Sequence, residues 1–556
     1  MPDSRTCTVG DAIAAFLAQA GVTEAFGVIS IHNMPILDAF ARQGRIRFVP
    51  ARGEAGGTNM ADACARTTGR LGVCVTSTGT AAGNAAGAMV EALTAGTPLL
   101  HLTGQIETPY LDRDLAYIHE APDQLATLKS VSKAAFRVLD KETALATVKQ
   151  AVQIARSAPT GPVSVEIPID IQRAEIAMPA ELQPLPVPVL APDAAAIGAL
   201  ADALAQARRP LLWVGGGARH AGAEVRRLMD MGFAVVTSTQ GRGVVPEDDE
   251  RSLGAFNVHA AAEAFYRTCD AALVVGSRLR GNETLTYKLA LPTPLYRIDA
   301  APGASDRGYR NAQFVCADAR LALAALADRL EGRLRVDPAF AADLAAARAA
   351  AREQVVQGIG PYAALVEGLQ RAAGQDFNWV RDVTLSNSIW GNRLLSIFSP
   401  RAGVHALGGG IGQGLAMGIG AAVGAAGTGR KTFVLAGDGG FILNIGELAT
   451  AVQECADMLI VLMNDKGYGV IKNIQDAHYG GRRHYVELHT PDYAGLAASL
   501  QLAHRRIDTL DGLDAVLADA LAQPGPCLLE VDMLAIGPFK TTFAGPPVRQ
   551  ADKAAA

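Results

Sequence analysis

Two segments decide the fold of this chain: Lys431-Thr-Phe-Val-Leu-Ala-Gly-Asp-Gly-Gly440 and, after it, Met458-Leu-Ile-Val-Leu-Met-Asn-Asp-Lys-Gly467. Each half opens with an apolar run of strand length, and the residues between them are enough for a helix. Two parallel strands joined by a helix bring their carboxyl ends to the same edge of a sheet. We therefore expect Asp438 and Asn464, one at the end of each strand, to lie close together.

Carboxylate and amide oxygens that meet at one point suit a hard cation such as Mg²⁺ or Ca²⁺. The glycines beside Asp438 let a phosphate approach the backbone near the start of a helix. That helix has a start signal with capping-box spacing, Asn444-Ile-Gly-Glu447. The direct interpretation is a metal that binds a pyrophosphate. The alternative is an ordinary tight turn with a solvated aspartate.

The composition limits the classes of protein to consider. The chain has 556 residues, 49% of them hydrophobic and 19% charged, so ample core can form over about three or four domains. A net charge of −5 argues against a partner made of nucleic acid. Seven scattered cysteines without a CxxC pair fit reduced thiols in the cytoplasm.

Two segments bear on targeting. The N-terminal residues 1–21 lack a basic region followed by a long apolar core, so we expect no signal peptide. Residues 402–429 carry no Asp, Glu, Lys or Arg, but their glycine density favours a glycine-rich loop and a buried helix over a membrane span.

Strand-like and helical patterns alternate along the chain, which predicts an α/β fold of three doubly wound, parallel-sheet domains. We expect them at residues 1–177, 193–335 and 360–538, with a proline-rich linker at 178–192 and a C-terminal tail at 539–556. An alanine-rich helix is expected at about 338–356. Further strands are expected at 48–49, 71–76, 98–103, 163–167, 210–214, 234–237, 272–275 and 295–298.

The first unit contains Arg52-Gly-Glu-Ala-Gly-Gly-Thr-Asn, then a segment from Gly72 to Asn84, then Leu102-Thr-Gly-Gln105. Together with the GDG and NDKGYG segments, these resemble the thiamine-diphosphate (ThDP) enzymes of the acetolactate synthase, oxalyl-CoA decarboxylase and benzaldehyde lyase branch. The resemblance covers nearly the whole chain. It implies a pyrimidine-binding domain, a central domain and a pyrophosphate-binding domain, with ThDP and Mg²⁺ as cofactors.

The resemblance also assigns roles to residues. Glu54 hydrogen-bonds the pyrimidine ring and promotes the imino tautomer that deprotonates C2 of the thiazolium; taken alone, it would be a glutamate favoured at a helix start. Ile411 bends the cofactor, a role that is compatible with the alternative of ordinary core packing, and the Gly409 carbonyl accepts the pyrimidine amine. The implied metal ligands are the side chains of Asp438 and Asn464 and the carbonyl of Lys466. The other implied cofactor contacts are Asn84, Gly410, Gly439, Gly440, Gly467 and Tyr468, with Ser386 and Asn387 in a Ser/Thr-rich segment, 384–388, that is otherwise typical of a turn.

Four residues are candidates for the substrate side. His32, after the first strand, aligns with a histidine of benzaldehyde lyase. His119 aligns with an active-site tyrosine of oxalyl-CoA decarboxylase, and Glu120 with an acidic position there. Gln105 ends the strand that begins near residue 98. A histidine moves protons near neutral pH, as this chemistry requires; the alternative is a structural, hydrogen-bonded histidine.

Two departures from the family narrow the activity. Gly469-Val-Ile471 replaces the glutamate of the pyruvate-decarboxylase type, and Leu253–His259 lacks the FAD-associated stretch of true acetolactate synthases, so no FAD is expected. We predict a ThDP- and Mg²⁺-dependent carboligase or lyase of 2-keto acids, working through an enamine at C2. One alternative is a 2-hydroxyacyl-CoA lyase or oxalyl-CoA-type decarboxylase, whose CoA would bind basic residues of the central domain. The candidates for that are Arg242, Arg278, Arg280 and Lys288.

The other alternative is a non-catalytic, ThDP-binding regulatory protein. The expected ligand is a small-molecule substrate, with neither nucleic acid nor a membrane as partner. In the superfamily, the two halves of the cofactor site come from different chains. The expected assembly is therefore a homodimer of dimers.

Overall fold

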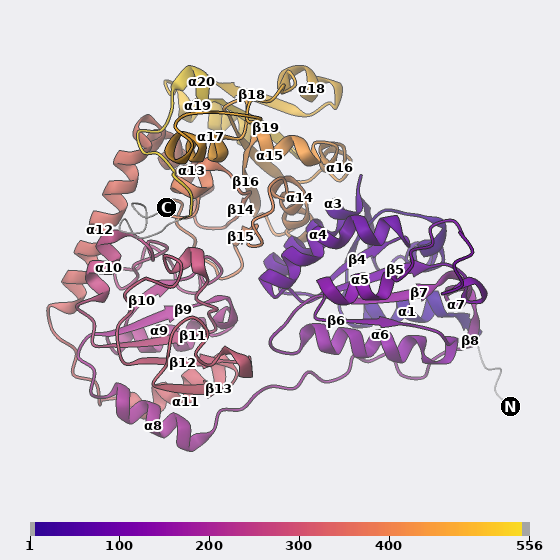
Figure 1. The fold of residues 1–556 in the computed structure, drawn as a ribbon, viewed down its shortest axis with the longest axis horizontal. Helices are drawn as coiled ribbons and strands as arrows, with labels where there is room; N and C mark the ends of the chain where they lie inside the picture. The colour runs from indigo at the N-terminus through magenta and orange to yellow at the C-terminus, as the bar shows by residue number, and fades with distance from the viewer. Residues whose placement is uncertain (1–5, 547–556) are drawn as a thin grey trace.

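The computed structural model describes residues 6–546 and contains three α/β domains (Figure 1). In the N-terminal domain, six parallel strands run in the order β3 (Arg47–Pro50), β2 (Glu24–Gly27), β4 (Gly72–Thr76), β5 (Leu99–Gln105), β7 (Val163–Pro168) and β6 (Ala134–Arg137). Its helices are α1 (Val9–Gln19), α2 (Met34–Gln43), α3 (Glu54–Thr68), α4 (Thr80–Ala95), α5 (Gln124–Val131), α6 (Lys141–Arg156) and α7 (Ile169–Arg173). The central strands β4, β5 and β7 are buried throughout because helices cover both faces of a parallel sheet.

The central domain has five parallel strands in the order β10 (Ala234–Thr237), β9 (Pro210–Val214), β11 (Ala271–Val275), β12 (Leu295–Asp299) and β13 (Gln313–Cys316). Its helices are α8 (Ala194–Leu204), α9 (Gly222–Asp230), α10 (Ala260–Tyr266) and α11 (Ala319–Leu330). A long extended segment joins the N-terminal domain to α8, and α12 (Phe340–Ile359) leads on to the third domain (Figure 1).

The C-terminal domain repeats the topology of the N-terminal one. Its parallel strands run in the order β15 (Gly403–His405), β14 (Phe377–Arg381), β16 (Lys431–Gly437), β17 (Met458–Asn464), β19 (Cys527–Asp532) and β18 (Ala503–Ile507). Its helices are α13 (Ala363–Ala373), α14 (Gly414–Gly424), α15 (Asp438–Phe441), α16 (Glu447–Gln453), α17 (Gly469–His478), α18 (Tyr493–Ser499), α19 (Leu513–Ala522) and α20 (Met533–Ile536). Thus α3 and α14 hold equivalent places in the two domains.

These two helices carry the contact between the N- and C-terminal domains (Figure 1). They approach so closely that a Cβ at Gly420 would lie 2.0 Å from the carbonyl oxygen of Met60. A single apolar cluster runs through both domains and includes Met60, Ile419 and Val434. Glycine and alanine in α14 are therefore needed for the close approach of two backbones rather than for flexibility.

Most elements expected from the sequence are confirmed. The expected strands fall on β3, β4, β5, β7, β9, β10, β11, β12, β16 and β17, and the alanine-rich segment forms α12. Residues 402–429 form a short strand, a glycine-rich loop and the buried helix α14, as expected. None of the helices within residues 6–546 is long and apolar enough to cross a membrane.

The sheets of the three domains are parallel, as expected, and β1 (Thr6–Thr8) pairs antiparallel with β8 (Glu175–Ala177), beyond the last strand expected in that domain, in a separate two-stranded sheet. One expectation was wrong. The segment Asn444–Glu447 is not a capping box. The helix after β16 begins at Asp438 itself, the Asn444 amide donates to the Gly412 carbonyl, and the Glu447 carboxylate reaches into the N-terminal domain.

Candidate active site

The ends of β16 and β17 meet as the sequence predicts. Asp438 is fully buried at the first position of α15, and its two carboxylate oxygens accept the backbone N–H groups of Asp465 (3.3 Å) and Gly467 (2.9 Å). A Cβ at Gly439 would lie 2.8 Å from the Gly467 carbonyl oxygen and 2.7 Å from the Tyr468 ring. The turn after one strand therefore packs directly on the turn after the other, and only glycine allows it.

Side-chain and backbone oxygens that could hold a cation lie at this junction. Asn464, the last residue of β17, donates its side-chain N–H to Oε1 of Glu530 at 2.8 Å, which leaves its Oδ1 on the opposite side of the amide. Lys466 adopts a left-handed conformation (φ 52°). Burial and the neighbouring Asp465 carboxylate raise the pKa of Asp438. The buried Asp438 carboxylate, the Asn464 amide oxygen and the Lys466 carbonyl form a donor set that fits Mg²⁺.

The glycine-rich loop before α14 is anchored by Asp382, at the end of β14. Both of its carboxylate oxygens accept the Gly412 N–H at 3.0 Å, and burial raises the pKa of Asp382 to about 7. A Cβ at Gly440 would lie 3.1 Å from both Asp382 Oδ2 and Gly412 N, so this loop packs on the GDG turn. Ile411 is 40% exposed, which excludes the core-packing alternative for it.

The Ser/Thr-rich segment, 384–388, lies beside the GDG turn. A Cβ at Gly437, beside Asp438, would lie 2.8 Å from the Thr384 hydroxyl, so Thr384 flanks the GDG turn. The Asn387 amide lies near the ring of His405, and the Ser386 hydroxyl is buried without a partner among the described residues. Of this segment, Thr384 therefore has the clearest contact with the site.

Glu54 is the first residue of α3 and half-buried, with Gly53 at the N-cap position. Asn84 of α4 donates its side-chain N–H to Glu54 Oε2 at 3.1 Å. The structure thus brings together two candidates that are 30 residues apart.

His32 and His119 are also neighbours, with ring centroids 5.3 Å apart in an edge-on arrangement. His32 is buried, and its Nδ1 has no hydrogen-bond partner in the part of the chain that the structure describes. Burial, and secondarily the nearby His119, lowers the pKa of His32, which favours the neutral imidazole. His119 is exposed, in a left-handed conformation (φ 67°).

The side chains of Gln105 and Glu120 form hydrogen bonds with nearby residues of the N-terminal domain. The side-chain oxygen of Gln105 accepts hydrogen bonds from the Thr78 hydroxyl at 2.9 Å and from the Ile106 N–H at 2.8 Å inside the N-terminal domain. The Glu120 carboxylate accepts the Tyr117 N–H at 2.9 Å. In this structure both side chains therefore stabilise loops next to the histidine pair.

Comparison with known proteins agrees with this geometry in all three domains. Residues 7–127 match the "Thiamine pyrophosphate enzyme, N-terminal TPP binding domain", residues 197–326 the corresponding central domain and residues 385–531 the C-terminal TPP binding domain. The chain belongs to the thiamine pyrophosphate enzyme family. Thiamine pyrophosphate is another name for ThDP.

Similar curated proteins cover nearly the whole chain. A probable 2-ketoarginine decarboxylase of Pseudomonas aeruginosa is 31% identical over 544 residues, 96% of this chain and 95% of that protein. Chloroplastic acetolactate synthases of Nicotiana tabacum and Zea mays are each 28% identical, over 94% of this chain and 81% and 84% of their own lengths. The chain is therefore a ThDP-dependent enzyme acting on carbon–carbon bonds.

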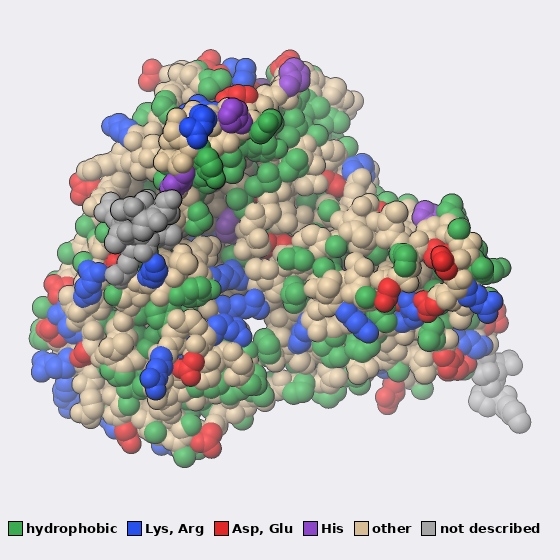
Figure 2. Space-filling model, in the orientation of Figure 1, with side chains coloured by type: hydrophobic (Ala, Val, Ile, Leu, Met, Phe, Trp, Pro, Cys, Tyr) green, Lys and Arg blue, Asp and Glu red, His purple; other side chains and the backbone are tan. Residues whose placement is uncertain are grey.

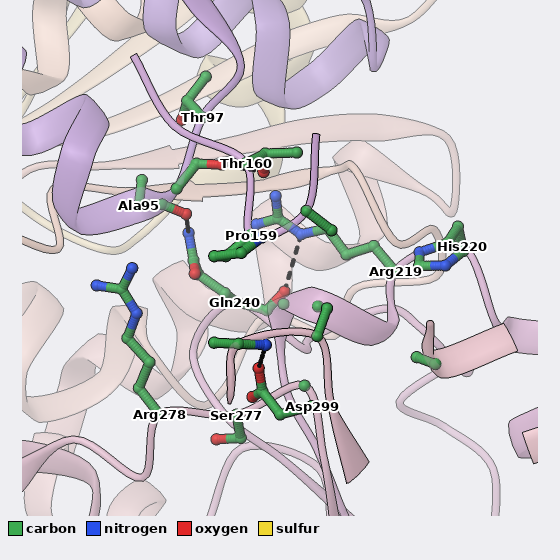
Figure 3. Close-up of a pocket in the computed structure, with 18 of the residues that line it drawn as sticks. Ala95, Thr97, Pro159, Thr160, Arg219, His220, Gln240, Ser277, Arg278 and Asp299 are labelled. Atoms are coloured by element: carbon green, nitrogen blue, oxygen red, sulfur yellow. Dashed lines mark hydrogen bonds between the residues drawn. The ribbon is translucent and has the colours of Figure 1, made fainter. Parts of the chain in front are cut away.

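The family's central domain here borders a cavity of about 440 Å³ at the carboxyl ends of its strands (Figure 3). Figure 2 shows Lys and Arg side chains gathered at the hollow between this domain and the N-terminal one. The arginines that line the cavity are Arg66, Arg156, Arg219, Arg278, Arg280, Arg307 and Arg401.

Of the basic residues considered for a CoA ligand, Arg278 and Arg280 line this cavity. Neither Arg242 nor Lys288 is among the described residues that do so. Arg242 is buried in a two-pronged pair with Glu247, at 2.7 and 2.6 Å, so it was a wrong candidate.

Sequence reasoning missed three buried acids around the site, Glu91, Asp382 and Glu530, and assigned the wrong contact to a fourth, Glu447. Each accepts hydrogen bonds that hold a segment carrying a candidate residue. Asp382 directly follows β14 and Glu530 lies two residues before the end of β19, and that position near a strand's carboxyl end was the available signal. Glu447 was noticed, but it was given a local role in place of a contact between domains.

Proposed function

We propose that this enzyme binds ThDP with Mg²⁺ and acts on 2-keto acids, as a decarboxylating lyase or carboligase. The observation that carries the proposal is the junction of Asp438, Asn464 and the Lys466 carbonyl beside the glycines of the GDG turn. The cofactor supplies an acidic carbon whose carbanion attacks carbonyls and then stores the electron pair. The protein supplies binding, orientation and proton handling.

Each part of the site has a share in that work. Asp438, Asn464 and Lys466 would hold the cation, while the backbone around Gly439 and Gly440 would face the diphosphate. Ile411 and the Gly409 carbonyl would hold the pyrimidine. Glu54, steadied by Asn84, would share its proton with the pyrimidine ring.

His32 is the candidate for proton transfer to the substrate. Burial lowers its pKa, which favours the neutral imidazole, and its Nδ1 has no partner among the described residues. A neutral imidazole can accept a proton from a hydroxyl and return it later. His119, which is exposed beside it, would line the entrance.

The proposal is tested by binding and then by turnover. Calorimetric titration should show ThDP binding only when Mg²⁺ is present. A panel of 2-keto acids, including one with a guanidinium side chain as the name of the P. aeruginosa relative suggests, should release CO₂ from at least one member. Tight ThDP binding without turnover of any 2-keto acid would contradict the substrate class but leave the cofactor site standing.

The arginine-lined cavity favours a second candidate, an acyl-CoA lyase or decarboxylase. Burial and the neighbouring charges of Arg66 and Arg401 lower the pKa of Arg219 to about 9, so positive charge is crowded there. A polyanion such as a CoA diphosphate would relieve that repulsion. Turnover of a 2-hydroxyacyl-CoA thioester, and none of the free acid, would select this candidate.

We also propose a dimer as the minimum active unit, and a dimer of dimers as the assembly. Large apolar side chains lie exposed beside the candidate site: Ile29, Ile31, Met34, Ile411, Leu443 and Ile471. An apolar surface rimmed by polar groups is typical of a face that a second copy covers. Sedimentation equilibrium measures the assembly, and a purely monomeric active enzyme would contradict it.

A further inference from the structure

Two buried glutamates, one in the N-terminal and one in the C-terminal domain, each accept hydrogen bonds from the other domain. Glu91 lies on α4, which follows β4, and Glu447 lies on α16, which follows β16 by way of α15. β4 and β16 hold the same position in sheets of identical strand order. The two glutamates therefore lie on helices that follow equivalent strands of the internal repeat.

The Glu447 carboxylate binds the backbone of the loop that leads into α3. Its Oε1 accepts the N–H groups of Arg52 at 3.0 Å and Gly53 at 3.1 Å, and its Oε2 accepts the Thr450 hydroxyl at 2.7 Å. The carboxylate lies so close that a Cβ at Gly56 would be 2.1 Å from Oε1. It therefore holds the N-terminal end of the helix on which Glu54 is the first residue.

Glu91 makes the reciprocal contact. Its Oε1 accepts the Leu407 N–H at 2.8 Å, and its Oε2 accepts the Gly408 N–H at 2.5 Å. A Cβ at Gly408 would be 2.9 Å from that second oxygen. These backbone groups open the loop that carries Gly409 and Ile411, the candidate pyrimidine contacts.

A buried cation keeps Glu91 in place. Arg66, from α3, donates to Glu91 Oε1 at 2.7 Å and to the carbonyl oxygen of His405 at 2.7 Å. Burial opposes ionisation of Glu91, but the charge of Arg66 and the two backbone N–H groups hold its pKa below the ordinary value. The carboxylate is thus charged when it binds the loop, which strengthens both hydrogen bonds.

We propose that Glu91 and Glu447 are reciprocal positioning residues, each holding the cofactor-facing loop of the domain to which it does not belong. The proposal rests on the proposed cofactor site, because the two loops face the cofactor only if that site is correct. Neither glutamate needs to touch the cofactor. Their work is to fix Glu54 on one side and Gly409–Ile411 on the other before anything binds, which lowers the ordering cost of binding.

Hydrogen exchange followed by mass spectrometry tests the contacts themselves on the full-length protein without cofactor. In Glu447→Ala, amide exchange at Arg52 and Gly53 should speed up at least about tenfold, because two charge-assisted hydrogen bonds are lost. Glu454→Ala is the matched control. It removes a pair with Arg47 across the same boundary and leaves the loop amides bonded, so it should not change their exchange.

Glu91→Gln is the second variant. The amide oxygen of the glutamine can still accept the hydrogen bonds from Arg66 and from the Leu407 N–H, while its NH₂ group faces the Gly408 N–H. Amide hydrogen exchange should therefore become faster at Gly408 and not at Leu407. Unchanged exchange at Arg52 and Gly53 in Glu447→Ala, or at Gly408 in Glu91→Gln, would overturn the proposal. Because no cofactor is present, these outcomes are independent of whether the proposed function holds.

ThDP titration then distinguishes positioning from general stability. Glu91→Gln should weaken ThDP binding by about tenfold, the effect of one lost charge-assisted bond on a binding loop. Glu447→Ala should slow exchange of the cofactor's C2 proton more than it weakens binding, and Glu447→Gln, which keeps one acceptor oxygen, should restore much of that rate. Equal losses in Glu454→Ala would overturn the proposal.

Discussion

The Glu530 side chain should control the metal site without touching the metal. Glu530 lies on β19, between β17 with Asn464 and β18 with His504, and is 4% exposed at its side chain. Its Oε1 accepts the Asn464 amide N–H at 2.8 Å, and its Oε2 accepts from His504 Nε2 at 3.1 Å. The hydrogen bond from His504 is the main reason that the pKa of Glu530 is lowered, so the carboxylate is ionised at neutral pH.

Glu530→Ala would remove the group that decides which way the Asn464 amide faces. With no acceptor behind it, the amide can rotate and present N–H in place of oxygen to a cation. Loss of such an outer partner typically costs 10–100-fold in metal affinity, which is about 1.4–2.7 kcal/mol. The free energy of unfolding should fall by about 1–3 kcal/mol as well, because a buried donor loses its partner.

Calorimetric titration of ThDP at a series of Mg²⁺ concentrations measures this effect, with circular dichroism to verify folding. Glu530→Gln is the matched control, since its carbonyl oxygen can still accept from Asn464 and should keep most of the affinity. His504→Ala, one partner further from the site, should cost less than Glu530→Ala. A folded Glu530→Ala protein with the Mg²⁺ dependence of the wild type would refute the reasoning.

Three further predictions follow from the structure. Glu54→Gln should still bind ThDP but exchange its C2 proton much more slowly, as quenched-flow NMR measures; a wild-type rate would contradict the role of Glu54. Glu54→Gln and Asp438→Ala chains, each inactive alone, should regain partial activity when co-refolded, because some mixed dimers hold one intact site; proven mixed dimers without activity would place each site within one chain. Burial lowers the pKa of His101 from 6.5 to about 4, so the folded state binds that proton less tightly than the unfolded chain. The contribution of neutral His101 to the free energy of unfolding is therefore full above pH 6.5 and is lost as the pH falls toward 4. Urea unfolding at pH 7 and pH 5 should show a smaller loss of free energy of unfolding between these two pH values in His101→Gln than in the wild type. An equal loss in both proteins would show that His101 does not cause this pH dependence.

The parts of the fold that the sequence predicts are those with local causes. β16 and β17 are continuous apolar runs that end in polar ligands, so strand, turn and candidate metal site all follow from a few residues. The interior strands β4, β5, β7, β9, β11 and β12 were also expected, because both of their faces are buried, whereas β14 and β19 were not. β8 was missed because it owes its structure to pairing with β1, far away in the chain.

The contacts that cross domains could not be predicted in this way. Glu447 has the spacing of a helix cap, yet its partners lie about 395 residues earlier in the chain. Glu91 sits within an alanine-rich helix and gives no local sign that it binds a loop more than 300 residues later. Both depend on the packing of α3 against α14, which brings the two domains together.

The central claim is that the ends of β16 and β17 form one Mg²⁺- and ThDP-binding site. The most direct measurement is calorimetric titration of ThDP into the wild type and Asp438→Ala, each with and without Mg²⁺. Binding should occur only in the wild type with Mg²⁺, because Asp438 is the only charged ligand proposed for the cation. Binding of equal affinity in Asp438→Ala, or binding by the wild type that is indifferent to Mg²⁺, would contradict the account.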